Sequence, residues 1–331
     1  MPSRRRLILA TLAAPGLARA QAPMAQSPAA QSPAWPTRPV RIVVPFPPGG
    51  SNDVFARPLA ERLQARTGQG FVIENRAGAA GAIGAGQVAQ APPDGTTLML
   101  ASVSVPTASI IQRTPWDAER DFDAITTVAR APFFIMVNPT VPARDVRELV
   151  ALAKRQPGAL NYGTSGAGGI NHFISVSFSQ AAGIEMSHVP YRGTAPAVTD
   201  LVAGHIQVML TTVASASAAI REGRVRLLAA TADGAPPAEG IPEVPSVRAQ
   251  GIPWDFDIWW GLFAPRGLPP EMRAAIHTAA VAALADPALA HIYAHEGAKP
   301  APVGPEDFPR ILREDMIRFR QVAQAANIRP E

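Results

Sequence analysis

The sequence predicts an α/β fold of two lobes, each a mainly parallel sheet flanked by helices, with a ligand cleft between the lobes. Short β-branched runs alternate with helical patterns along the chain, which favours parallel strands joined by helices. The roughly 290 residues after the N-terminal segment exceed what one hydrophobic core comfortably serves. Two glycine-rich loops far apart in the sequence each stand between a strand and a helix. One such loop is expected in each lobe.

The individual elements follow from these patterns. We expect strands at residues 40–44, 71–74, 96–101, 160–163, 205–210 and 225–230, and helices from Ser51 onward and at residues 81–91, 145–154 and throughout 269–331. Two apolar runs, residues 133–138 and 258–264, are expected to cross between the lobes. Lobe 1 would then hold residues 37–134 and 258–331, and lobe 2 residues 135–257. Pro58 removes a backbone donor, which predicts a kink or a late start in the helix after Ser51.

The N-terminus has the three parts of a secretory leader. Arg4, Arg5 and Arg6 precede an apolar run at residues 7–17, and small residues occupy the cleavage positions before Gln21. The run is too short to span a bilayer. We expect residues 1–20 to be a cleavable signal, of the general secretory or the twin-arginine type, and the mature protein to be periplasmic. Residues 21–36, uncharged and rich in Ala, Pro, Gln and Ser, predict a flexible tether.

Charge and composition exclude several classes of function. The leader holds four arginines and no acidic residue, so the mature chain carries 26 basic and 26 acidic side chains. Without a basic cluster, no nucleic-acid partner is expected. The chain has no cysteine, which rules out thiol catalysis and thiolate metal sites. Its six histidines are taken to be scattered without a metal-ligand spacing, so neither metal nor cofactor is expected.

The first glycine-rich loop, residues 45–53, joins a strand to a helix. Gly49 and Gly50 allow a ligand to approach the backbone closely. The helix start that follows presents unpaired N–H groups and the positive end of the helix dipole, which together favour an anion. Ser51 and Asp53 can complement the first turn. The loop therefore predicts either an anion site or a capped turn without a ligand.

The second glycine-rich loop, residues 162–172, repeats this chemistry in the other predicted lobe. It offers the hydroxyls of Thr164 and Ser165 and several accessible backbone amides. Ligands of open α/β sheets bind beyond the carboxyl ends of the strands, so the two loops suit one ligand held between them. A hydrolase that uses Ser165 as nucleophile is the alternative. It is disfavoured because Ala167 replaces the final glycine of G-x-S-x-G and His172 is too close in sequence to act as a separate base.

Residues 189–194 follow another short strand. Tyr191 could form a wall of the pocket, and Arg192 could pair with a carboxylate or with a surface acid.

Several motifs occur together in one order along the chain. They are residues 41–46 with Asp53, 74–76 (ENR), 93–95 (PDG), 164–166 with His172, 189–193 (VPYRG), 260–265 (WGLFAP) and 327–331 (NIRPE). In these motifs the chain closely resembles the Bug receptors, the solute-binding components of tripartite tricarboxylate transporters, from Trp35 onward.

This resemblance implies a two-lobed, periplasmic-binding-protein-like fold that closes on a small organic anion. It implies a monomeric receptor, not an enzyme, whose partners are membrane transporter subunits or a sensor kinase ectodomain. The expected ligand-binding residues are Phe46, Pro48, Gly49, Gly50, Ser51, Asp53, Ser102, Ser104, Thr164, Ser165, Gly166, Gly169, His172, Tyr191, Arg192 and Gly193. The chain departs from the family at residues 204–211, where two acidic residues common in the family are missing. This departure makes an amino group on the ligand harder to satisfy.

Overall fold

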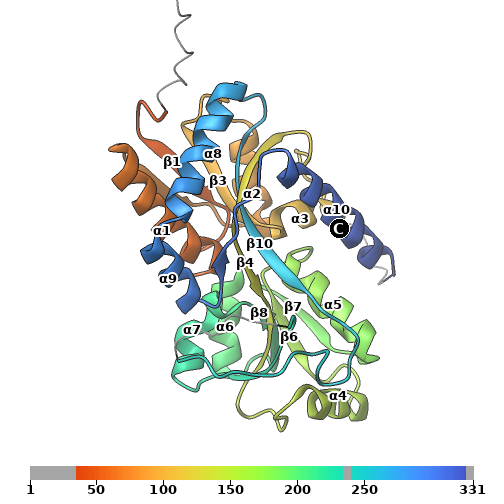
Figure 1. Cartoon of the computed structure of the whole chain (residues 1–331). Coiled ribbons are helices and arrows are strands. Elements are labelled where there is room, and N and C mark those ends of the chain that lie inside the picture. The colour runs from red at the N-terminus through yellow and green to blue at the C-terminus, as the bar shows by residue number, and fades with distance from the viewer. Residues whose placement is uncertain (1–34, 234–239, 326–331) are drawn as a thin grey trace, which may run out of the picture. The chain divides into compact units, whose positions relative to one another are not determined.

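The strands of the protein form two separate sheets (Figure 1). The computed structural model describes residues 35–233 and 240–325. The first sheet has the strand order β11-β4-β10-β3-β1-β2. Its strands are β1 (Val40–Val44), β2 (Phe71–Asn75), β3 (Thr97–Ser102), β4 (Phe122–Pro132), β10 (Asp257–Pro265) and β11 (Lys299–Pro300). The second sheet has the order β7-β6-β8-β5-β9. Its strands are β5 (Phe134–Val137), β6 (Asn161–Thr164), β7 (Ser187–Pro190), β8 (Val208–Thr211) and β9 (Arg226–Ala230).

Both sheets are mixed, with a parallel half and an antiparallel half. β1 pairs in parallel with β2 and β3, and β6 pairs in parallel with β7 and β8. The strands next to the crossings between sheets, β4, β5 and β10, pair antiparallel with their neighbours. The α/β fold is confirmed. The parallel pairing expected of each sheet is found only among β1, β2 and β3 in the first sheet and among β6, β7 and β8 in the second. β5 and β10 run against the parallel strands of their sheets, whereas β4, which is antiparallel to β10, runs in the same direction as β1, β2 and β3.

Helices surround both sheets (Figure 1). They are α1 (Ser51–Thr67), α2 (Ala82–Ala89), α3 (Ser104–Ile111), α4 (Val146–Arg155), α5 (Ile170–Ala182), α6 (Thr194–Ala203), α7 (Val213–Arg221), α8 (Pro270–Leu284), α9 (Pro287–His295) and α10 (Asp307–Ala325). Helix α1 begins at Ser51 and runs through Pro58, so the late start expected from this proline is wrong. Of the helices in the described ranges, none alone is long and apolar enough for a membrane span; the bent pair α8 and α9 meets that test only when taken together.

The long antiparallel ladder between β4 and β10 is the centre of the first sheet. It runs from the pair Asp257–Pro132 to the pair Pro265–Phe122. After Pro132 the chain continues almost directly into β5 of the second sheet, and it comes back from β9 to β10. The strand β4 was not among the expected elements, because its small and polar residues, Thr126 and Thr127 among them, hide the β pattern although they are fully buried.

One apolar core passes through both sheets. Ile42 and Leu98 of the first sheet belong to the same buried cluster as Val137 and Leu210 of the second. The opposite face of the second sheet has a smaller core of its own, in which Met136 and Met209 are covered by residues of α6 and α7. This alternation along β5 is what a strand buried on both faces requires.

Helix α10 fastens the two sets of elements to each other. It packs against α3 and β4 on one side and against α5 on the other. Phe319 of α10 lies against Phe173 of α5 and against Phe256, with ring centroids 5.5 and 5.8 Å apart. Near its start, Phe308 packs over Gly261 of β10, whose missing side chain leaves room for the ring.

Gly261→Ala is expected to destabilise the protein by about 1–3 kcal/mol, because the added methyl group would overlap the ring of Phe308 in a filled core. Urea denaturation measures this change. Gly70→Ala is the matched control, since its nearest new neighbour would be 3.8 Å away. Phe308→Leu combined with Gly261→Ala should recover part of the loss. Equal effects of the two single alanine variants would contradict the proposed packing of α10.

Candidate functional site

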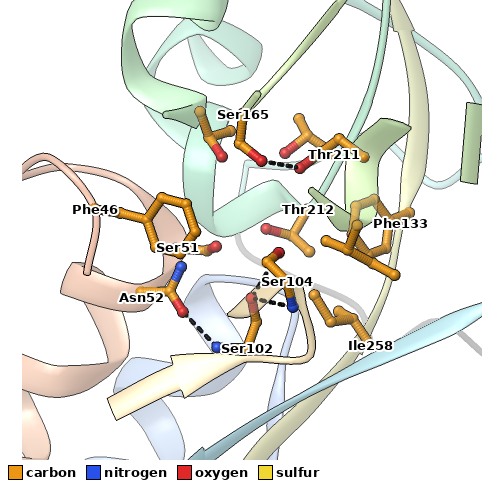
Figure 2. A pocket seen from close by; sticks show the side chains of 13 residues that line it. Phe46, Ser51, Asn52, Ser102, Ser104, Phe133, Ser165, Thr211, Thr212 and Ile258 are labelled. Carbon is orange, nitrogen blue, oxygen red and sulfur yellow. Dashed lines mark hydrogen bonds between the residues drawn. The ribbon is translucent and has the colours of Figure 1, made fainter. Parts of the chain in front are cut away.

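The starts of five helices meet at one small pocket between the two sheets (Figure 2). α1 and α3 come from the first sheet, and α5, α6 and α7 from the second. The residues that line the pocket are Phe46, Ser51, Asn52, Ser102, Ser104, Phe133, Ser165, Ile170, Asn171, Thr194, Thr211, Thr212 and Ile258. The pocket thus lies beyond the carboxyl ends of the parallel strands, where open α/β sheets bind ligands.

None of these five helices is capped by a side chain. The residues at the N-cap positions are Gly50, Val103, Gly169, Gly193 and Thr212, and none of them accepts a hydrogen bond from the first turn. Of the helices that start away from the pocket, α4 and α9 are capped by Asp145 and Asp286, whereas α2 and α8 have no side-chain cap. Uncapped starts leave N–H donors and the positive ends of the helix dipoles directed at the pocket.

The pocket wall is polar but carries no formal charge. Hydroxyl and amide side chains lie between Phe46 on one side and Phe133 and Ile258 on the other (Figure 2). The thirteen lining residues include no Asp, Glu, Lys, Arg or His. The free volume is only about 10 Å³, which is room for about one water molecule. A molecule larger than water does not fit this space as it stands.

Two asparagines hold the loops around the pocket in place. Asn52 accepts a hydrogen bond of 2.6 Å from the backbone N–H of Ser102 and so ties α1 to the end of β3. Asn171 donates a bond of 2.6 Å to the carbonyl of Leu210 and ties α5 to β8. Each amide connects two strand ends within one sheet, so the two walls of the pocket are preorganised separately.

The two walls touch each other at several places, of which three lie next to the glycine-rich loops. The N–H of Ser51 donates to the hydroxyl of Ser215 on α7 at 3.2 Å. Gly166, with φ +128°, lies close to Ala80. Gly193, with φ +131°, packs so closely on Pro47 that an added Cβ would lie 2.5 Å from the proline ring. Only glycine combines this backbone conformation with this approach.

Asp53 does not face the pocket. Its carboxylate accepts two hydrogen bonds from Arg57, at 2.8 and 2.9 Å, one of 2.9 Å from Asn75 and one of 3.1 Å from the N–H of Gly49. Burial alone would raise the pKa of Asp53, but these bonds outweigh it and hold the pKa below its ordinary value. Asp53 therefore stays ionised and neutralised, and it fixes the shape of the loop.

His172 and His188 form a stacked pair behind the second loop. Their ring centroids are 4.0 Å apart with planes at 7°, and Tyr162 stacks on the far side of His188. His172 Nδ1 accepts a bond of 3.3 Å from the N–H of Gly168, and His188 Nε2 shares one of 2.6 Å with the hydroxyl of Thr164. Burial, and for His172 also the neighbouring His188, lowers the pKa of each ring to about 4. The neutral pair supports the loop from behind.

Ser165 lacks the partner that a nucleophile needs. Its hydroxyl donates to Asn171 Oδ1 at 3.1 Å, and an amide oxygen does not take up a proton at ordinary pH. The Nδ1 atom of His172 already accepts from Gly168. In residues 35–233 and 240–325, no group of three or more His, Cys, Asp or Glu side chains could hold a metal ion.

The expected site residues separate into two groups. Phe46, Ser51, Ser102, Ser104 and Ser165 line the pocket. The others lie around it: Pro48, Gly49 and Arg192 are exposed, Gly50, Gly169 and Gly193 precede the helices, Thr164 and Gly166 are buried in the second loop, and Asp53, His172 and Tyr191 bond to protein groups.

Other lining residues were not foreseen. Asn52 and Asn171 are next to expected residues in the sequence. An amide side chain in the first turn of a helix that follows a glycine could have indicated them. Thr211 and Thr212 follow β8 as Ser102 follows β3, so the rule of strand ends applies to them as well. Phe133, Ile170, Thr194 and Ile258 give no signal in the sequence beyond their places near strand or helix ends.

Comparison with protein families identifies one match. Residues 55–328 match the model of the tripartite tricarboxylate transporter family receptor. The chain is also 35% identical over 293 residues to a UPF0065 protein from the tcbD-tcbE intergenic region of Pseudomonas sp. strain P51, covering 87% of this chain and 86% of that one.

Two solved structures from Rhodopseudomonas palustris are similar to this one throughout. Rpa4515 with adipate is 32% identical with a TM-score of 0.85, covering 90% of this chain and 100% of that one. MatC with bound malate is 28% identical with a TM-score of 0.80, covering 87% and 99% of the two chains.

Acidification is expected to destabilise the protein through His172 and His188. In the unfolded chain their pKa returns to the ordinary value of 6.5, whereas in the folded protein it is about 4. Between these values the unfolded chain binds more protons, so the stabilising contribution is complete above pH 6.5 and is lost as the pH falls towards 4. We expect a loss of up to about 3 kcal/mol for each ring, measured by urea denaturation at several pH values. In the double variant His172→Gln, His188→Gln the profile should be flatter, and an unchanged profile would contradict this assignment.

Proposed function

Because the chain belongs to the family of tripartite tricarboxylate transporter receptors, we propose that it is a periplasmic receptor that binds a small organic carboxylate in the pocket between its two sheets. The proposed lobes are residues 37–134 with 258–331, and 135–257. These lobes would open to admit the ligand and close around it.

The uncapped helix starts around the pocket carry this proposal. All five direct the positive ends of their dipoles at a space without a charged side chain. A ligand would compete there for N–H groups such as that of Ser51, which donates to the hydroxyl of Ser215. A carboxylate supplies the missing acceptors, and the dipoles compensate its charge. A cationic ligand would find neither a carboxylate nor a negative helix end on the lining.

The proposed ligand has a short carbon chain between or beside its carboxylates. The similar structures of Rpa4515 and MatC contain adipate and malate, which are dicarboxylates. In this protein, Phe46 on one side of the pocket and Phe133 and Ile258 on the other offer apolar contacts for the carbon chain. The hydroxyls of Ser165, Thr211 and Thr212 between them can donate to carboxylate oxygens.

We favour a receptor without catalytic activity over a hydrolase that uses Ser165. The hydroxyl of Ser165 is bonded to an amide oxygen, and both nearby histidines are engaged behind the loop. Binding and release then require only the motion of the lobes. The proposed partners that receive the ligand are membrane transporter subunits or a sensor kinase ectodomain, and the receptor itself would act as a monomer.

The family of ligands can be found by thermal unfolding in the presence of mono-, di- and tricarboxylates, aromatic acids and amides. A carboxylate that binds only the folded protein should stabilise it by about 2.7 kcal/mol at a hundredfold excess over Kd. Ser165→Ala should weaken binding about tenfold or more, since a hydrogen bond to a charged group is lost.

Ser187→Ala is the matched control, because the Ser187 hydroxyl bonds to the carbonyl of Gly158 on the exposed surface. It should leave the affinity unchanged. The receptor proposal would be wrong if no carboxylate stabilised the protein while an ester or amide was consumed and Ser165→Ala abolished that turnover.

Expression of the full chain in a Gram-negative host should yield a periplasmic protein whose first residue is Gln21. The proposed leader, residues 1–20, lies outside the described residues, so this is tested chemically. N-terminal sequencing of the periplasmic fraction gives the cleavage position. Arg4→Lys with Arg5→Lys should retain the protein in the cytoplasm only if export follows the twin-arginine route. A full-length protein that stays in the cytoplasm would disprove export.

A further inference from the structure

Two histidines stand one turn apart on the surface of α9. The sequence from 291 to 295 is His-Ile-Tyr-Ala-His, so the expectation that the histidines lack a metal-ligand spacing is wrong. The Nε2 atoms of His291 and His295 lie 2.9 Å apart, with ring centroids at 4.3 Å and ring planes at 88°. Both nitrogen atoms therefore point at one place beside the helix.

We propose that His291 and His295 form a binding site for one divalent transition-metal ion of the class that prefers imidazole ligands, namely Zn²⁺, Ni²⁺ or Cu²⁺. Pairs of histidines at positions i and i+4 of a helix are a recurrent way to hold such an ion. The site is separate from the carboxylate pocket, which contains neither residue, and it does not depend on the proposed function.

The geometry of the pair fits chelation. Bonds from zinc to imidazole nitrogen are about 2.0–2.1 Å long. Two such bonds at angles from 90° to tetrahedral place the nitrogens about 2.9–3.4 Å apart. The observed separation of 2.9 Å lies within this range, so neither ring has to leave its place to bind the ion.

The position on the helix favours a cation. His295 is the last residue of α9, and the negative end of the helix dipole stabilises positive charge there. His291 is exposed to solvent, so water can complete the coordination shell. The backbone carbonyl of His295 accepts a bond of 2.8 Å from Arg221 of α7, which fixes the end of the helix.

The alternative is a hydrogen bond between two neutral rings, in which one Nε2 donates and the other accepts. That arrangement would give the same distance without any affinity for a metal. The two explanations differ in what happens when metal is added, and a direct titration separates them.

The test uses the mature chain from Gln21 without an affinity tag, freed of metal with a chelator. Isothermal titration with ZnCl₂, NiSO₄ and CuSO₄ should show one ion per chain for at least one of the metals. The Cu²⁺ complex should show the electron-spin resonance signal of two nitrogen ligands. His291→Ala and His295→Ala should each weaken binding at least about tenfold, because a single surface imidazole remains.

His205→Ala is the matched control, because His205 is also an exposed histidine but pairs with Asp200 instead of another imidazole. It should bind metal as the unchanged protein does. Circular dichroism should show the same helix content in all variants. Absence of binding, or full binding in His291→Ala and His295→Ala, would overturn the proposal and leave the hydrogen-bonded pair as the explanation.

Discussion

The antiparallel ladder between β4 and β10 is the constraint on which the rest of the structure depends. The chain passes from one sheet to the other at the end of β4 and returns at the start of β10, so both passages are held side by side by backbone hydrogen bonds. Phe133 follows β4 and Ile258 belongs to β10, and both line the pocket. The base of the pocket is therefore also the joint between its two walls. Motion of one wall against the other would have to bend this ladder or the short segments beside it, and it would change the packing of α10, which contacts α3 and β4 as well as α5.

The pocket lacks both capping side chains at its helix starts and charged side chains on its lining, and these two absences determine its chemistry. Glycine precedes three of the five helices, where a capping side chain would satisfy the first turn internally. The carboxylate of Asp53, in the first turn of α1, is turned away from the pocket and accepts hydrogen bonds from Arg57 and Asn75. A site with many neutral donors can accept carboxylates of different shapes. A donor that does not reach the ligand can bond to water instead, so little binding free energy is lost. A buried arginine would bind one carboxylate more strongly but would leave an uncompensated charge in its absence.

The sequence predicts the parts of this structure that depend on local signals. The glycine loops, the helix after Ser51 and the crossing segments are all visible as composition changes, and the family is recognisable from its motifs. The strand β4 is not, because Thr126, Thr127 and several alanines are buried only through tertiary contacts. The same applies to Thr211 and Thr212, which become site residues only when β8 is placed between β6 and β5. The spacing of His291 and His295 is visible in the sequence. That both rings lie on one side of a helix becomes clear only from the structure.

The contact between Gly193 and Pro47 limits how closely the two walls of the pocket approach each other. No side-chain atom can be inserted here without pushing the walls apart, so this point defines how far they approach. A spacer as small as one methyl group would leave the donors on both walls intact but would hold them slightly too far apart to grip the same ligand together. Such a change acts on the lifetime of the complex more than on the encounter with the ligand. Under the proposed function, the residue at position 193 would influence how long the cargo stays bound, and with it how readily the receptor gives the cargo up.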